Sequence, residues 1–131
     1  MLIRADGNVG INTSAPSEKL EVNGNVKATA FLYSSDKRLK EHILPLKNSL
    51  EKILSLNGYS FDWKADGRKD IGVIAQEVET VFPDAVKTDK ESGMKSVEYA
   101  NLVAPLIESI KTQQQEIDAL KSEVQELKAR K

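Results

Sequence analysis

The chain has 131 residues, of which 40% are hydrophobic and 30% charged, and its formal net charge is −1. This length allows one ordinary domain, or one small domain with an extension. The near-zero charge gives no long-range attraction to nucleic acid or to an anionic membrane. With no cysteine and one histidine, disulfides, Cys-type zinc sites and a His-rich metal site within one chain are excluded, and we expect no cofactor.

No apolar run approaches the roughly 20 residues that span a bilayer. The first six residues turn polar too soon for a signal peptide, so we expect a soluble piece of a longer protein.

Residues 1–34 predict short β-strands broken by turns. Gly and Asn adopt positive φ at low cost, so residues 6–8 and 23–25 are predicted turns. Leu20–Val22 and Val26–Ala28 alternate apolar and polar side chains, as half-buried strands do. A segment this short buries no core of its own, and we expect it to interlock with identical strands from sister chains.

The middle of the chain predicts a small α+β domain. Leu39, Ile43 and Leu46 have helical spacing, but Pro45 lies within this stretch and interrupts it. The further predicted elements are a short helix at 49–56, an aromatic strand at 59–63, a strand at 71–74 and a short helix at 75–81. We expect the aromatic strand, with Trp63, to form the core.

From residue 103 onward, a heptad pattern of about three and a half repeats predicts a helix roughly 43 Å long. The a and d positions are Val103, Leu106, Ile110, Gln113, Ile117, Leu120, Val124 and Leu127. Pro105 must lie in or near the first turn, or it would kink the helix. A chain this small cannot cover such a helix, so partner chains are implied.

We call these a and d positions the seam. The charges beside the seam favour parallel helices in register. Glu116 with Lys121, and Glu123 with Lys128, fall at g and e′ positions, where they would be opposite-charge neighbours across helices. β-branched a positions with Leu at d favour a dimer, but Gln113 at a d position weakens that preference.

The hexapeptide Ser35-Asp36-Lys37-Arg38-Leu39-Lys40 combines a hydroxyl nucleophile with a candidate base. A lysine can take a hydroxyl proton once it is neutral, a form that burial and neighbouring positive charges favour. We hypothesise that Ser35 is the nucleophile, that Lys40 is the general base and that the cut falls at the Ser35–Asp36 bond. Attack by Ser35 on its own carbonyl would close a strained four-membered ring. Attack on the preceding carbonyl, or on a sister chain, is easier and could shift the cut by one residue.

A purely structural interpretation also fits this stretch. Ser35 would cap a helix, Asp36 would lie near its positive end, and the basic residues would form a solvated face. His42 fits a surface or packing role better than that of a base.

Two further segments favour the catalytic interpretation. They are Gly72-Val73-Ile74-Ala75-Gln76-Glu77-Val78, followed by Phe82-Pro83-Asp84-Ala85-Val86, and Ser96-Val97-Glu98-Tyr99-Ala100-Asn101-Leu102-Val103-Ala104-Pro105-Leu106. In this order, together with residues 35–43, they resemble the endosialidase-type intramolecular chaperone domain that ends phage tailspikes and tail fibres. The resemblance covers residues 35–131, and the stretch before it resembles the fibre segments that precede this domain.

The resemblance implies a homotrimeric domain that registers the upstream fibre segment of its own chain and then cuts itself off as a Ser-Lys peptidase. It implies assembly in the host cytoplasm, a parent fibre in the virion tail, and no nucleic-acid or membrane partner. A non-cleaving trimerisation domain is the alternative. A bacterial surface protein or a membrane-bound transcription factor released by the same domain stays open as a third.

Overall fold

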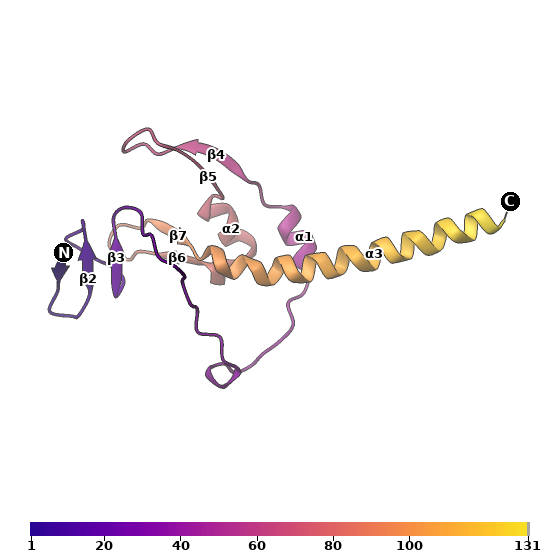
Figure 1. Cartoon of the computed structure of the whole chain (residues 1–131), viewed down its shortest axis with the longest axis horizontal. Helices are drawn as coiled ribbons and strands as arrows, with labels where there is room; N and C mark the ends of the chain where they lie inside the picture. Colours follow the sequence, from indigo (N-terminus) through magenta and orange to yellow (C-terminus); the bar gives the residue numbers. More distant parts are fainter. Residues whose placement is uncertain (131) are drawn as a thin grey trace. The chain divides into compact units, whose positions relative to one another are not determined.

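The computed structural model describes residues 1–130, which form two compact units, residues 1–43 and the part from Leu44 onward. The first unit holds a three-stranded sheet of β1 (Leu2–Ile3), β2 (Val9–Ile11) and β3 (Leu20–Val22) (Figure 1). β2 pairs antiparallel with β1 and parallel with β3. The predicted strand at 20–22 is therefore confirmed.

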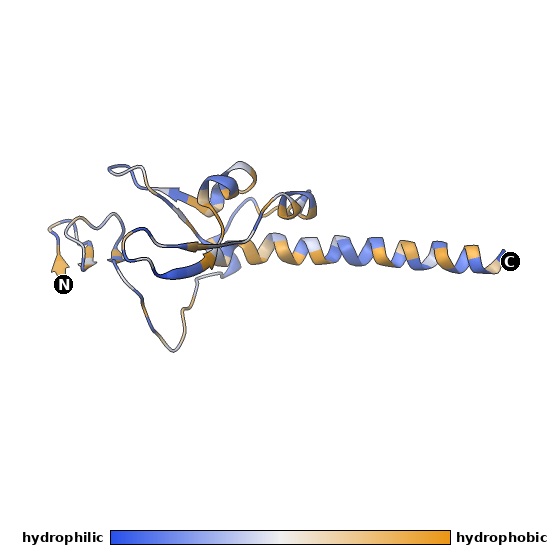
Figure 2. Cartoon of the chain, turned by 90° about the horizontal axis from the view of Figure 1, so that it is seen from above, coloured by the Kyte–Doolittle hydropathy of each residue, from blue (hydrophilic) through white to orange (hydrophobic). Residues whose placement is uncertain are grey.

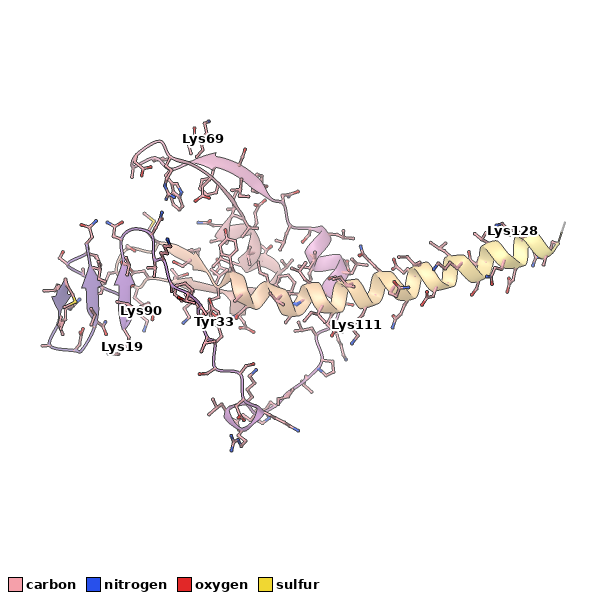
Figure 3. The ribbon with its side chains drawn as sticks, viewed as in Figure 1. Lys19, Tyr33, Lys69, Lys90, Lys111 and Lys128 are labelled. Atoms are coloured by element: carbon pink, nitrogen blue, oxygen red, sulfur yellow. The ribbon has the colours of Figure 1, made fainter. Side chains whose placement is uncertain are left out.

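The predicted strand at Val26–Ala28 is wrong, because residues 25–34 have no regular structure. In the described part of the chain, no backbone hydrogen bond joins this stretch to another segment. The alternating side chains therefore do not belong to a paired strand, and Leu32 is 95% exposed. Figure 3 labels Tyr33, which is also exposed, on this extended stretch.

The helical spacing of Leu39, Ile43 and Leu46 corresponds to no helix beyond one turn. The 3₁₀ helix η1 spans only Lys37–Leu39, and Lys40 after it is extended, with φ −124° and ψ 146°. His42 has a φ of 52°, which no α-helix contains. Pro45 disfavours helical geometry at the residue before it, so the apolar spacing there reflects no continuous helix.

The second unit is a mixed α+β structure, as predicted. Its elements are α1 (Ser49–Leu54), β4 (Tyr59–Asp62), β5 (Lys69–Gly72), α2 (Ala75–Val81), the 3₁₀ helix η2 (Pro83–Ala85), β6 (Val86–Thr88), β7 (Lys95–Val97), the 3₁₀ helix η3 (Tyr99–Leu102) and α3 (Val103–Ala129). β4 with β5, and β6 with β7, form separate antiparallel hairpins. The helix predicted at 75–81 is confirmed, and the one predicted at 49–56 ends two residues earlier.

The packed centre of this unit lies where α2 meets η2 and β7. Val78 of α2 is fully buried, and Ala85 of η2 is nearly so. Beside them, the Tyr99 hydroxyl accepts a hydrogen bond from the Val73 N–H at 3.1 Å. A Cβ on Gly72 would lie 2.5 Å from that hydroxyl oxygen, so a larger residue at this position would displace the Tyr99 side chain.

The aromatic strand is not the core that the sequence predicts. Trp63 is 45% exposed. Its ring meets Phe61 edge-on at 5.2 Å between centroids, and its indole N–H donates to Asp70 at 3.0 Å. Because a two-stranded hairpin offers little surface to pack against, its aromatic side chains stay partly open to solvent.

The long C-terminal helix is confirmed as α3, whose 27 residues extend over about 40 Å. Pro105 is its third residue, where the missing N–H leaves no intrahelical bond unmade. Within this unit, α1 packs against the N-terminal part of α3. No helix or strand of the described residues lies beside the C-terminal half of α3 (Figure 1).

The contact between Gly72 and Tyr99 predicts a position-specific effect of an added methyl group. Gly72→Ala should lower the free energy of unfolding by about 1–3 kcal/mol, because the Tyr99 side chain must move and weaken its bond to Val73. Gly58→Ala is the matched control, since nothing lies within 4 Å of a Cβ there. Urea unfolding at one chain concentration measures both variants. Equal stability of the two would contradict this packing.

Candidate functional site

Ser35 and Lys40, the two predicted catalytic residues, lie in direct contact within the first unit. The Lys40 Nζ donates a hydrogen bond to the Ser35 Oγ at 2.8 Å. Both side chains are exposed. A hydroxyl and an amine at this distance have the geometry that proton transfer from a serine to a lysine requires.

A tight turn between the two residues brings them together. Asp36, not Ser35, caps the 3₁₀ helix η1, because its Oδ1 accepts the Arg38 backbone N–H at 2.8 Å. The interpretation of Ser35 as a helix N-cap is therefore wrong. The Asp36 carboxylate also accepts two bonds from the Arg38 guanidinium, at 3.1 and 2.9 Å.

This pairing changes the titration of both partners. The side-chain bond from Arg38, followed by the bond from its backbone N–H, lowers the pKa of Asp36 below its ordinary value. The same side-chain bond raises the pKa of Arg38. With its pKa lowered, Asp36 stays charged to lower pH than an ordinary aspartate does. From the sequence, Asp36 is predicted beside the cut or near the positive end of a helix, but not as the cap, although Asp side chains often bond the backbone two residues on in such turns.

Other polar residues near the turn have more ordinary surroundings. His42 is exposed, and its nearest carboxylate is that of Glu41 at 3.9 Å. This agrees with the predicted surface role. Within residues 1–130, no group of three or more His, Cys, Asp or Glu side chains could hold a metal ion, and no helix combines the length and apolarity of a membrane span.

In the second motif, Glu77 of α2 has a defined partner. The Tyr59 hydroxyl of β4 donates to its Oε1 at 2.7 Å, and its Oε2 is buried without a hydrogen-bond partner among the described residues. This bond joins β4 to α2. It gives Glu77 a structural role that the sequence analysis did not assign.

The predicted seam residues lie on an exposed face of α3. Its apolar members are each 44–65% exposed: Val103, Leu106, Ile110, Ile117, Leu120, Val124 and Leu127. Gln113 is exposed as well. Figure 2 shows apolar bands that recur along α3 to its C-terminal end.

The opposite face of α3 is the one its own unit covers. Pro105 and Ser109 are buried, and Glu108 and Thr112 are half-buried. Ser109 satisfies its hydroxyl by donating to the Pro105 carbonyl at 2.7 Å. The N-terminal part of α3 thus turns small and polar side chains inward and apolar ones to solvent, the reverse of a helix that serves only its own chain.

Among the described residues, the charged side chains beside the seam make no ion pair. In the part of the chain that the structure describes, the ion pair on α3 joins Lys111 to Glu108 at 3.3 Å. The charges flanking the seam make none: Glu116, Lys121, Glu123 and Lys128. Lys111 and Lys128 are labelled on the helix in Figure 3.

Part of this sequence matches a known protein family. Residues 35–87, which begin at the nucleophile candidate, match the protein family described as chaperone of endosialidase. The resemblance predicted from the motifs is therefore confirmed, and this part of the chain belongs to that family.

Two relatives show where such sequences occur. The chain is 39% identical over 95 residues to an uncharacterised protein of Dictyostelium discoideum, over 62% of this chain and 8% of that protein. It is 32% identical over 109 residues to the long tail fiber protein Gp37 of Enterobacteria phage K3, over 76% of this chain and 9% of that protein. The chain thus spans less than a tenth of either relative.

A solved structure described as a novel intramolecular chaperon is also similar, with 18% identity and a TM-score of 0.44, over 63% of this chain and 99% of the other.

The bond between Tyr59 and Glu77 predicts a pH dependence. That bond raises the pKa of Tyr59, and Glu77→Gln should lower it toward the ordinary value of about 10. Since the bond needs the protonated phenol, its contribution to stability is complete below the ordinary pKa and is lost as pH rises through the raised one. Ultraviolet titration of tyrosinate, assigned with Tyr59→Phe, measures the shift. An unchanged titration in the Gln variant would exclude this coupling.

Proposed function

We propose that this chain is an intramolecular chaperone domain that assembles three copies of a fibre and then releases itself by cutting near Ser35–Asp36. The observation that carries the proposal is the 2.8 Å contact between the Lys40 Nζ and the Ser35 Oγ. Membership of residues 35–87 in the chaperone-of-endosialidase family supports the assembly role. The similarity to a phage long tail fiber protein supports a fibre as the upstream partner.

The chemistry begins with the proton on Lys40. A charged Lys40 donates to the Ser35 oxygen, whereas a neutral amine accepts the hydroxyl proton while Oγ attacks a carbonyl carbon. The C–N bond then breaks, and Lys40 returns the proton to the leaving nitrogen. The resulting ester is hydrolysed by water, which yields a carboxylate and restores the hydroxyl.

The bond that breaks depends on which carbonyl is attacked. Attack within one chain falls on the carbonyl of Ser34, because attack by Ser35 on its own carbonyl would close a four-membered ring. The released domain then starts at Ser35. Attack by a sister chain can break the Ser35–Asp36 bond, and the released domain then starts at Asp36. The two products differ by one serine residue.

In this proposal, assembly controls the reaction through the surroundings of Lys40. Burial and neighbouring positive charges favour a neutral lysine. Lys37 and Arg38 are close in sequence, but Lys40 is exposed in the single chain. Sister chains would have to supply the apolar cover, so the cut would follow assembly.

The outward face of α3 is the surface proposed to hold the copies together. Burying its seven half-exposed apolar side chains contributes on the order of 1 kcal/mol each. The total for three chains, on the order of 20 kcal/mol, is comparable with the cost of bringing them together. The free energy gained by burying the seam is thus sufficient for association, and it exceeds the cost of association by little.

Charge selects the direction of the helices in this assembly. In a parallel arrangement, Glu116 and Glu123 face Lys121 and Lys128 of a neighbour. An antiparallel arrangement would place glutamates opposite glutamates and lysines opposite lysines. Gln113 would oppose slippage, because a shift of one heptad sets its amide against a leucine layer. Parallel chains in register are what an upstream fibre requires.

Intact mass measured over time tests the self-cleavage. The wild-type chain should release a fragment that starts at Ser35 or Asp36, whereas Ser35→Ala and Lys40→Ala should each slow release by a factor on the order of 100 or more. Ser34→Ala and Lys37→Ala are matched controls that remove a neighbouring hydroxyl and a neighbouring amine, and both should still cleave. If all five proteins behave alike, the peptidase proposal is wrong.

A pair of charge insertions tests the seam. Ile117→Asp places a charge in an a position and should leave single chains at micromolar concentration, with loss of cleavage. Ser122→Asp adds the same charge at an f position, away from the seam, and should remain assembled and cleave. Sedimentation velocity reads the assembly. Equal behaviour of the two variants would remove the seam from the account.

There are two alternative functions. A non-cleaving trimerisation domain would assemble through α3 but release no fragment. The relative from Dictyostelium discoideum, which is not a phage, favours a third candidate, in which the same domain assembles and releases a cellular protein.

A further inference from the structure

The contact between Ser35 and Lys40 requires a particular backbone. On a continuous α-helix, residues five apart lie about 140° apart around the axis and cannot face each other. The contact therefore needs a chain that turns and then leaves the helix. Lys40 does leave it, with an extended φ of −124° and ψ of 146°.

A short series of hydrogen bonds that starts at Asp36 forms this turn. Its side chain accepts the Arg38 N–H at 2.8 Å, and its carbonyl accepts the Leu39 N–H at 3.0 Å. The Lys40 N–H then bonds to the Lys37 carbonyl at 3.1 Å, which ends the turn at the residue whose amine reaches Ser35.

The Arg38 side chain also stabilises this turn. Its guanidinium donates to both Asp36 carboxylate oxygens, so the carboxylate that caps the turn is also fixed in orientation. Bidentate Arg–carboxylate pairs have a defined geometry, which a single contact lacks. Lys37 and Lys40 are the other charged side chains inside the turn, and the structure pairs neither with this carboxylate.

We propose that Asp36 and Arg38 are positioning residues for the self-cleavage, forming a clamp that holds the turn in which Lys40 meets Ser35. This rests on the proposed function. The clamp makes no contact with the Ser35 hydroxyl and acts through the backbone alone. Asp36 is then required for geometry, whether the Ser34–Ser35 or the Ser35–Asp36 bond breaks.

Cleavage rates of single variants of the full chain test the clamp. Asp36→Ala should slow release by about 10- to 100-fold, because small misplacements of reacting groups have effects of this size. Asp36→Asn keeps an oxygen for the Arg38 N–H but loses the charge, so it should fall between wild type and Asp36→Ala. Asp66→Ala is the matched control. Asp66 accepts the Arg68 N–H at 3.0 Å in another Asp-x-Arg turn, and its loss should leave the rate unchanged.

Arg38 variants separate geometry from the chemistry of the residue at the cut. Arg38→Ala should also slow release, and Arg38→Lys should not restore it, because lysine cannot bind both oxygens. The double variant Asp36→Ala/Arg38→Ala should be no slower than Asp36→Ala alone, since the two residues act as one unit. In the double variant, which removes one charge of each sign, the pH dependence of the remaining rate should stay that of the wild type. Wild-type rates in the Arg38 variants, or a changed pH profile in the double variant, would overturn the proposal.

A second measurement needs no cleavage. In the uncleavable Ser35→Ala chain, amide hydrogen exchange at Arg38, Leu39 and Lys40 should speed up when Asp36→Ala is added. Unchanged exchange overturns the clamp, even if all variants cleave slowly. If the wild-type chain releases no fragment, the proposed function fails, and exchange alone then decides whether Asp36 holds the turn.

Discussion

The constraint on which the other features depend is the direction in which α3 faces its apolar side chains. Its own unit covers the side with Pro105 and Ser109, and the isoleucines, leucines and valines of the heptads remain half exposed. A helix of this length with an open apolar stripe is a poor end state for a single chain in water. Other copies of the same helix match it in spacing, and in charge when they lie parallel.

The proposed role in fibre assembly follows from this constraint. Intertwined strands depend on contacts far apart in sequence and form slowly. Helices that associate first would raise the effective concentration of the upstream segments and set their register. Residues 25–34, which have no regular structure and no strand partner among the described residues, are the segment that such registration would serve. A cut after assembly would remove the easiest route back to separate chains and leave the fibre kinetically trapped.

Much of this could be predicted from the sequence, because some signals are local. Helix 75–81 and the length of α3 follow from periodicity and end signals. The helical spacing after Ser35 predicts the wrong backbone, because the spacing of apolar residues does not reveal the side-chain cap at Asp36 or the extended backbone at Lys40. The strand at Val26–Ala28 and the buried Trp63 failed for a related reason. Both predictions assumed more surface to pack against than the described residues supply. The chemistry of the hexapeptide predicts the Ser35–Lys40 contact, but only the structure shows the turn that forms it.

Native mass spectrometry of the Ser35→Ala chain over a dilution series tests the central claim most directly, because it counts copies without loss to cleavage. The account predicts a three-chain species that persists to micromolar concentration. A single chain at those concentrations, with α3 intact by circular dichroism, would contradict it.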